Sequence, residues 1–208
     1  MHPNPIYRRE NAARSLTFLR DRSFGTLAVN GEAGPLLAHV PFVISPDGGS
    51  VELHLVRSNP ILRAIKEPQP VVLSVTGPHG YISPDWYGVD DQVPTWNYVA
   101  VHLRGSLSIM DHGELRGVLD RLSGQFEGRI TDKKPWVADK MTPEVLEKMM
   151  GMIVPCRLEI SDLQSTWKMS QNKTDAARIG AANGAASAGI GQEVDQLRDW
   201  MLDAIENT

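Results

Sequence analysis

The chain has 208 residues, a formal net charge of −4 at pH 7 and a single cysteine, Cys156. A chain of this length forms one domain, or one domain with an appendage, and buries enough apolar surface to need no cross-links. One cysteine excludes an internal disulfide and a cysteine metal cluster. No long basic run is present, which argues against a non-specific nucleic-acid surface.

The N-terminal stretch contains no apolar segment of the kind that a secretory signal requires. No window approaches the roughly 18 continuous apolar residues of a membrane-spanning helix. We therefore expect a cytoplasmic protein without a membrane span.

The first part of the chain predicts an extended arm, a short helix and three strands that follow one another as a meander. These elements are expected at His2–Tyr7, Asn11–Arg20, Ser23–Asn30, Pro35–Ile44 and Val51–Val56. Pro41 cannot donate a ladder hydrogen bond, so its position in the second strand is predicted to be an edge or a bulge.

The junction after the third strand has the composition of a phosphate site. Ser58 or Asn59 is expected to cap a helix whose first residue is Pro60. The free N–H groups of such a helix start, with Arg57 before it and Arg63 one turn later, would form a phosphate cradle. An ordinary helix cap with surface arginines is the alternative interpretation.

The middle of the chain predicts a central strand, an aromatic loop and a long half-buried strand. The central strand is expected at Pro70–Thr76, and the stretch Gly80–Gly105 contains two of the five Trp and three of the four Tyr. From Val99 onward apolar and polar residues alternate, which indicates a strand. The aromatic loop either covers one end of a barrel or a dimer contact, or forms a wall of a cofactor pocket.

The last part predicts two helices, a strand, a polar patch and a terminal helix. The predicted ranges are Leu115–Glu127, a helix with Thr142 as N-cap and Pro143 as first residue, Met152–Ser161, the donor-rich patch Gln164–Asn172 and a helix at Thr174–Ala182. The Gly/Ala-rich residues 181–191 are expected to be a flexible linker. Residues 192–208 are expected to hold an amphipathic helix, so the predicted main domain is residues 1–180.

About six sequential strands with helices between and after them predict an α+β fold, an antiparallel β-barrel with peripheral helices. No glycine-rich dinucleotide fingerprint, P-loop, zincin or nucleophile-elbow motif occurs. His39, His54 and His102 are too scattered along the predicted strands to indicate a metal site.

Five stretches together resemble one family, the PaiB-type FMN-binding negative transcriptional regulators. They are HVPFVI at 39–44, HLVRSNP at 54–60, YISPDWY at 81–87, VPTWNYVAVHLRG at 93–105 and KMSQNKTDAARIG at 168–180. The family has Leu where this chain has Met169, which is a conservative apolar exchange.

The resemblance implies a flavin-binding split barrel similar to pyridoxamine-phosphate oxidases and flavin reductases, assembled as a homodimer with FMN at the subunit interface. It implies that the FMN phosphate contacts Arg57, Ser58 and Asn59. It places the ring along the strand that contains Ala38, His39, Val40 and Pro41. It further implies contributions from Trp96 and Asn97 at the dimer interface, and from Lys168, Ser170 and Gln171 at the polar rim.

Three functions are compatible with this resemblance. The first is a flavin-binding negative regulator that acts indirectly, because no helix-turn-helix or basic face supports direct DNA binding. The second is an FMN-dependent oxidoreductase that uses a reduced nicotinamide, with an open face lined by Trp96, Trp167 or His102. The third is haem binding or degradation, for which none of the six histidines stands in a recognisable axial motif.

Overall fold

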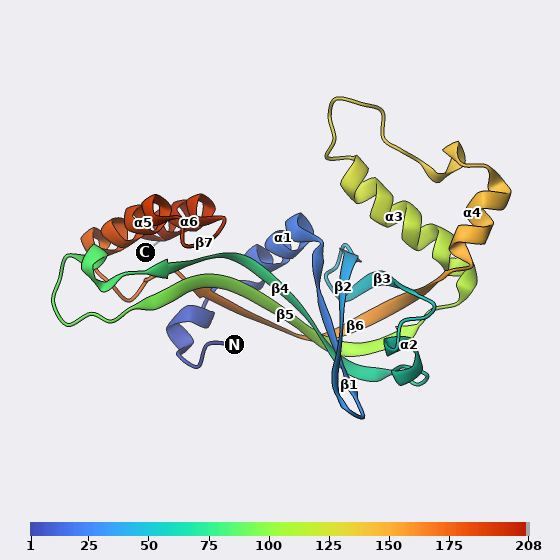
Figure 1. Ribbon diagram of the computed structural model, residues 1–208, viewed down its shortest axis with the longest axis horizontal. Helices are drawn as coiled ribbons and strands as arrows, with labels where there is room; N and C mark the ends of the chain where they lie inside the picture. Colours follow the sequence, from blue (N-terminus) through green and yellow to red (C-terminus); the bar gives the residue numbers. More distant parts are fainter. Residues whose placement is uncertain (207–208) are drawn as a thin grey trace. The chain divides into compact units, whose positions relative to one another are not determined.

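The computed structural model describes the backbone of residues 1–206 and the side chains of residues 1–203 (Figure 1). Ile205, expected on the apolar face of the terminal helix, and residues 207–208 therefore lie outside what is described. The strands are β1 (Phe24–Gly31), β2 (Gly34–Ile44), β3 (Ser50–Val56), β4 (Gln69–Ile82), β5 (Thr95–Ile109), β6 (Ile153–Lys168) and β7 (Gly191–Gln192). The α-helices are α1 (Ala12–Arg22), α2 (Ile61–Ala64), α3 (Leu115–Glu127), α4 (Pro143–Met150), α5 (Asp175–Ala188) and α6 (Val194–Glu206).

The chain divides into two compact units whose segments alternate along the sequence. Unit 1 comprises Met1–Ser15, Thr76–Val101 and Gln164–Thr208, and unit 2 comprises Leu16–Val75 and His102–Leu163. The predicted domain end at residue 180 falls inside α5. Single-turn 3₁₀ helices lie at η1 (Pro5–Arg8), η2 (Pro84–Tyr87), η3 (His112–Glu114) and η4 (Ala138–Lys140).

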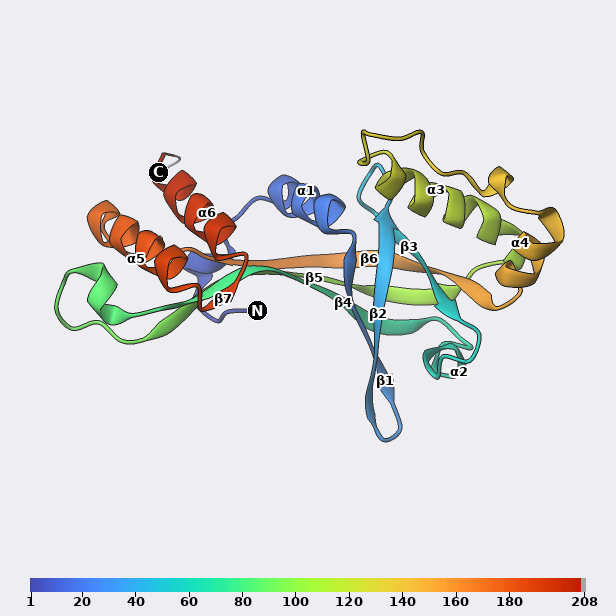
Figure 2. The same ribbon diagram turned by 45° about the horizontal axis from the view of Figure 1, so that its top comes forward.

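Unit 2 is built on an antiparallel barrel. Its strands follow the order β1-β2-β3-β6-β5-β4, and β1 also pairs with β4, which closes the sheet. The closing pairs join Thr26–Val29 to Val71–Ser74. Figure 2 shows the long β1–β2 hairpin, which pairs from Phe24 opposite Pro41 to the turn at Gly31–Gly34. The predicted α+β split barrel is confirmed.

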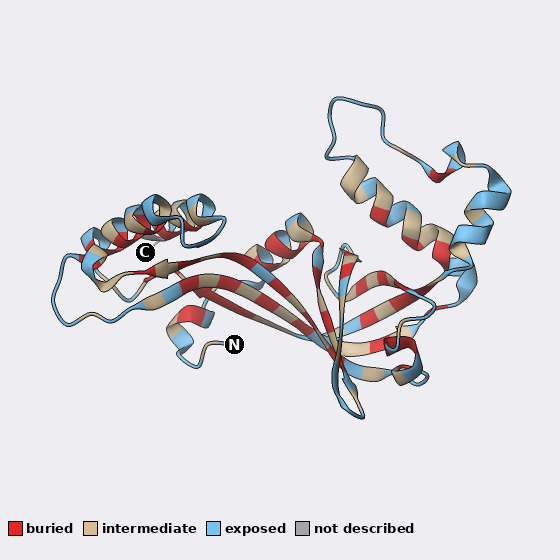
Figure 3. Ribbon diagram, in the orientation of Figure 1, coloured by how far each residue is buried: buried red, intermediate tan, exposed pale blue. Residues whose placement is uncertain are grey.

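Period-two alternation of apolar residues fills this barrel. Along the strands, buried and half-exposed positions alternate (Figure 3), because successive strand side chains point to opposite faces. Large side chains that are fully buried include Leu27, Phe42, Leu53, Leu73, Leu103, Leu107 and Leu158. The single thiol, Cys156, is among the buried residues, and burial raises its pKa to about 12, so it is an inert core residue.

Helix α3 packs on the outer side of β2 through the apolar face that its sequence predicts. Val118 and Leu122 form a buried cluster with Met110, and Val43 of β2 and Phe126 pack against it. Each buried aliphatic side chain of this kind contributes roughly 1.5–3 kcal/mol to the free energy of unfolding.

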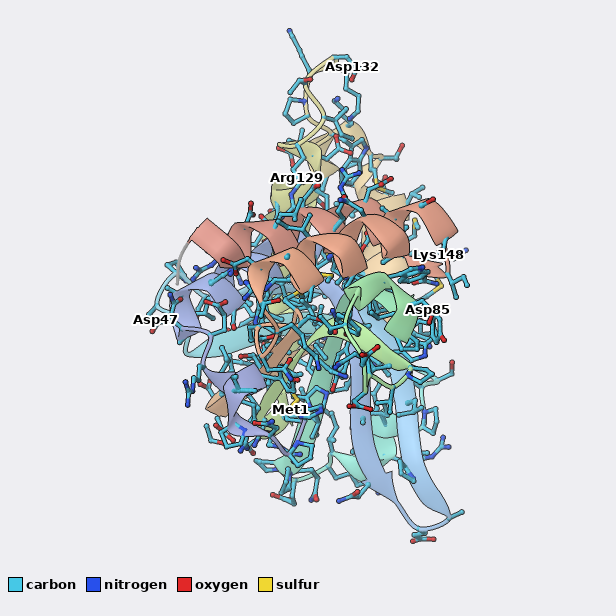
Figure 4. The ribbon with its side chains drawn as sticks, turned by 90° about the vertical axis from the view of Figure 1, so that its left-hand side faces the viewer. Met1, Asp47, Asp85, Arg129, Asp132 and Lys148 are labelled. Carbon is cyan, nitrogen blue, oxygen red and sulfur yellow. The ribbon has the colours of Figure 1, made fainter. Side chains whose placement is uncertain are left out.

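In unit 1, the structure differs from the predicted flexible linker at residues 181–191. Residues 181–188 are helical, since α5 continues to Ala188, and only the left-handed Gly189 ends it. Figures 1 and 4 show α5 beside α6 and beside η2, which carries the labelled Asp85. The small residues of α5 allow this close packing: a Cβ on Gly180 would lie 2.3 Å from the carbonyl oxygen of Trp86. The composition therefore reflects a packed helix face, not flexibility.

Gly180→Ala is expected to destabilise the protein by about 1–3 kcal/mol, because the new methyl group collides with backbone that cannot move aside. The matched control is Gly124→Ala, also inside a helix, where a Cβ meets nothing within 4 Å. This control should stabilise by up to about 1 kcal/mol through helix propensity. Urea unfolding followed by circular dichroism measures both, and two changes of the same sign would disprove the packing argument.

Candidate functional site

The barrel of unit 2 is split between β2 and β3. These strands pair only at Phe42 with Leu53, Val43 with Glu52 and Ile44 with Val51. If this register continued, Pro41 would lie opposite His54 and Ala38 opposite Arg57. In the described residues β2 pairs only with β1 over this stretch, while β3 pairs with β6. The outward backbone edge of Ala38–Pro41 is therefore open for hydrogen bonds.

Arg57 lies directly after β3, at the end of the strand that borders this split. Its Nε donates to the carbonyl oxygen of Gly151 at 2.8 Å, and its Nη2 lies 3.5 Å from that of Ile153. These contacts leave part of the guanidinium fork unused, and the side chain is exposed. Such a fork is suited to a phosphate, which it binds through two parallel hydrogen bonds.

The helix that follows begins one residue later than predicted. α2 has four residues and begins at Ile61, so Pro60 is its N-cap and not its first helical residue. The Asn59 Oδ1 accepts from the N–H of Ile61 at 3.0 Å. Asn59 nevertheless lies one residue before the N-cap, so the predicted cap at Ser58 or Asn59 is wrong: Pro60 is the N-cap and makes no side-chain cap bond. One helical turn carries little dipole, so Arg57 and Arg63 must supply the positive charge of this junction.

The junction fits a phosphate group. Within the described part of the chain, neither Arg57 nor Arg63 has a carboxylate within ion-pairing distance, whereas other arginines of the unit do, such as Arg157 with Glu52 at 3.0 Å. Ser58 is exposed beside Arg57 and offers a hydroxyl. A guanidinium without a carboxylate partner, a hydroxyl and the open edge of β2 are the donors and acceptors that a phosphorylated ring compound requires.

Among the predicted site residues of β2, His39 has a reactive side chain. It is exposed, and its Nδ1 lies 3.0 Å from the Thr26 hydroxyl across the hairpin. Ala38 is half-buried and Val40 points into the core. On its outward side, β2 therefore offers a ligand its backbone groups and the ring of His39.

In unit 1 the predicted residues Asn97 and Ser170 are brought together. The Asn97 amide donates to Ser170 Oγ at 2.8 Å, and the hydroxyl of Tyr87 lies 3.2 Å from the same oxygen. Asn97 is fully buried, so it positions Ser170. Ser170 has a positive φ of 57°, a strained conformation that is often found at functional sites.

Lys168 and Gln171 have different environments. Lys168 Nζ contacts the hydroxyl of Thr95, and burial lowers the pKa of its ammonium group. The Gln171 amide is used within its own turn: it accepts from the N–H of Met169 at 2.7 Å and donates to the carbonyl of Trp167 at 2.6 Å. Gln171 thus holds the turn that presents Lys168.

The two tryptophans that were predicted to line an open face above the flavin differ in their exposure. Trp96 is 45% exposed, and its ring lies 6.3 Å from Tyr81 and 6.0 Å from His79. Trp167 is buried, stacks against Trp200 at 5.1 Å and hydrogen-bonds to Ser15. Trp96 is therefore the accessible aromatic residue of this pair.

Sequence reasoning missed several residues that surround Lys168. Tyr7, Gln92, Thr95 and Lys173 line one small pocket with Lys168. Tyr7 comes from the N-terminal arm and Gln92 from a loop, and nothing in their local sequence indicates this long-range contact. No group of three or more metal-ligating side chains occurs among the described residues.

Comparison with known proteins places this geometry in a family. Residues 1–162 match the family described as "Putative FMN-binding domain". The chain is 32% identical over 167 residues to the Bacillus subtilis protein "Protease synthase and sporulation protein PAI 2", covering 79% of each chain. The chain belongs to the FMN-binding domain family. Family membership confirms the predicted cofactor, FMN, and the PaiB-type resemblance.

Solved structures share the fold of this FMN-binding domain. The FAD- and haem-binding protein of Mycobacterium smegmatis matches with a TM-score of 0.57 and 20% identity, over 78% of this chain and 73% of that one. The flavocytochrome Anf3 of Azotobacter vinelandii matches with a TM-score of 0.56 and 15% identity, over 81% and 72%. At these identities the likeness establishes the fold alone. No described helix of the FMN-binding domain is long and apolar enough to cross a membrane.

His54, in the HLVRSNP stretch, should make the FMN-binding domain sensitive to acid. Burial lowers the pKa of its imidazole below 6.5, and its Nδ1 has no partner in the described residues. The unfolded chain therefore binds this proton at a higher pH than the folded chain, so stability is full above pH 6.5 and falls as the pH falls below it. We expect His54→Leu to lose less stability between pH 7 and pH 5.

The free energy of unfolding, measured by urea titration at several pH values, tests this. One proton contributes at most about 1.4 kcal/mol per pH unit. The same substitution at an exposed histidine, His112→Leu, is the control for the loss of a histidine as such. Equal slopes for wild type and His54→Leu would contradict the assignment.

Proposed function

We propose that this chain holds FMN at the split of its barrel. The phosphate is bound by Arg57, Ser58 and the backbone of Asn59, and the polar edge of the ring meets the open edge of β2 at Ala38–Pro41. One observation carries this proposal: the pairing of β2 with β3 stops at Phe42. The backbone groups of β2 before Phe42, on the side that would face the end of β3 and Arg57, are therefore free.

The proposed biological output is negative regulation of gene expression by an indirect route in the cytoplasm. The similarity to the Bacillus subtilis protein named for protease synthesis and sporulation supports this output. A net charge of −4 provides no electrostatic basis for direct DNA binding, so we propose control through a small molecule or a protein partner.

The proposed assembly is a homodimer. The outward face of the β1–β2 hairpin exposes apolar side chains, with Phe24 at 55% and Leu37 at 63%. Such exposed apolar residues on a sheet face favour burial against a second copy.

Arg57→Ala should weaken FMN binding by about 10- to 150-fold, because a charge-assisted phosphate contact contributes roughly 1.5–3 kcal/mol. Riboflavin, which lacks the phosphate, should bind the variant and the wild type equally within about twofold. Fluorescence quenching of each flavin on titration with the apoprotein measures both affinities.

The riboflavin comparison separates phosphate recognition from the structural bonds that Arg57 makes to Gly151 and Ile153. Arg116→Ala serves as the control, because this arginine of α3 pairs with Asp120 and Asp139 and should leave both affinities unchanged. An equal loss of FMN and riboflavin affinity would show that Arg57 does not bind the phosphate group of FMN.

A second candidate is an FMN-dependent oxidoreductase, favoured by the exposed Trp96 with its neighbours His79 and Tyr81. Bound FMN would supply hydride acceptance and electron transfer. The chain's own contribution would be an aromatic surface against which a nicotinamide ring packs.

The visible spectrum separates the two candidates. For the regulatory proposal, we expect the FMN-loaded protein to keep its two flavin absorption bands for minutes under anaerobic conditions with excess reduced nicotinamide. Free FMN under the same conditions gives the background rate. Bleaching well above that rate, with turnover once oxygen is admitted, would favour the oxidoreductase, and a Soret band would favour haem binding.

A further inference from the structure

Unit 1 contains a small pocket that is built entirely from its own segments. It has a volume of about 150 Å³. The lining residues come from the N-terminal arm, η2, the loop before β5, β5 itself and the turn after β6: Tyr7, Tyr87, Gln92, Val93, Thr95, Lys168, Ser170, Asn172 and Lys173. Drug-sized ligands occupy roughly 300–1,000 Å³, so this pocket holds a single small group.

Two ammonium groups reach this pocket without an acidic partner. Lys168 Nζ contacts the Thr95 hydroxyl, and Lys173 Nζ contacts the Gln92 side-chain carbonyl. Both also lie over aromatic rings, Lys168 at 5.8 Å from Tyr7 and Lys173 at 5.2 Å from Tyr87. In the part of the chain that the structure describes, no carboxylate lies within ion-pairing distance of either lysine. The pocket therefore carries two positive charges that nothing in the described residues neutralises.

The hydroxyl of Tyr7 is a further unused donor. Tyr7 is only 6% exposed, it lines the pocket, and its hydroxyl has no hydrogen-bond partner among the described residues. A ligand oxygen in the pocket would accept a hydrogen bond from this hydroxyl.

The wall of the pocket at Ser170 is held rigidly. Its hydroxyl is shared by the Asn97 amide at 2.8 Å and the Tyr87 hydroxyl at 3.2 Å, and its backbone adopts the left-handed φ of 57°. Asn97 and Ser170 are almost wholly buried. Groups that are fixed before binding lose less conformational entropy when a ligand arrives.

We propose that this pocket binds a small dianion of the phosphate type, the terminal group of a phosphorylated small molecule, between Lys168 and Lys173. Two ammonium groups match a double negative charge, and hydroxyl and amide donors match the remaining oxygens. The proposal does not rest on the FMN site, because every residue named here belongs to unit 1 and Arg57 belongs to unit 2. A ligand bound here is a signal or substrate that accompanies the flavin.

The test titrates inorganic phosphate into the FMN-loaded protein and follows binding by calorimetry. We expect saturable binding of one phosphate per chain. Lys168→Met and Lys173→Met should each weaken it by about tenfold or more, and Tyr7→Phe, which removes only the hydroxyl, by a few-fold. If Lys168→Met fails to fold, the other two variants still decide the question.

Two controls locate the phosphate. Lys148→Met removes one exposed lysine, which Figure 4 labels on α4, and should leave phosphate binding unchanged. Arg57→Ala, reloaded with saturating FMN, should also bind phosphate normally. Loss of binding in either control, absence of saturable binding to wild type, or binding only to the flavin-free protein would overturn the proposal. Tighter binding of succinate than of phosphate would overturn the assigned ligand class.

Discussion

The early end of the β2–β3 ladder is the constraint on which the candidate FMN site depends. A closed six-stranded barrel satisfies its backbone groups by pairing every strand on both edges, and unit 2 does so through the β1–β4 pairs. Between β2 and β3 the pairing ends at Phe42 and Leu53. Pro41, which lacks an N–H, stands at the first position of β2 that has no partner on β3, although it pairs with Phe24 of β1. A ladder that closed there would leave no open backbone edge beside Arg57.

Local sequence patterns predicted most of the strands and the covering helix α3, because burial in a barrel follows strict alternation and α3 has a distinct apolar face. They failed at α5. Glycine and alanine in Gly180–Gly191 were interpreted as flexibility, whereas Gly180 and Gly184 lie against Trp86. Only the tertiary partner distinguishes a close-packed helix from a linker, and that partner is distant in the sequence.

The candidate sites show the same limit of local sequence patterns, which do not reveal contacts between residues far apart in the chain. Arg57, Ser58 and Asn59 directly follow a strand, so a local pattern indicated their junction. The predicted helix start was one residue too early, because Pro60 is the N-cap and Asn59 bonds to the N–H of Ile61 from the residue before it. Pro68 limits how far α2 can extend, but the local pattern does not fix the end of the helix at Ala64. Tyr7 could not be assigned to any site from sequence, since its neighbours Lys168 and Tyr87 are brought to it only by folding.

The two proposed anion sites differ in chemistry, and the difference matches their proposed ligands. At Arg57 a planar guanidinium is fixed by backbone carbonyls, which suits a permanently bound phosphate that must be held in one orientation. In the unit 1 pocket two flexible ammonium groups rest on hydroxyl, amide and aromatic partners that they can leave when an anion enters. Ammonium groups act as point charges and impose little geometry, so this pocket is suited to a ligand that exchanges. A cofactor held by one arrangement and a changing metabolite held by the other is the combination that an indirect, ligand-dependent regulator requires.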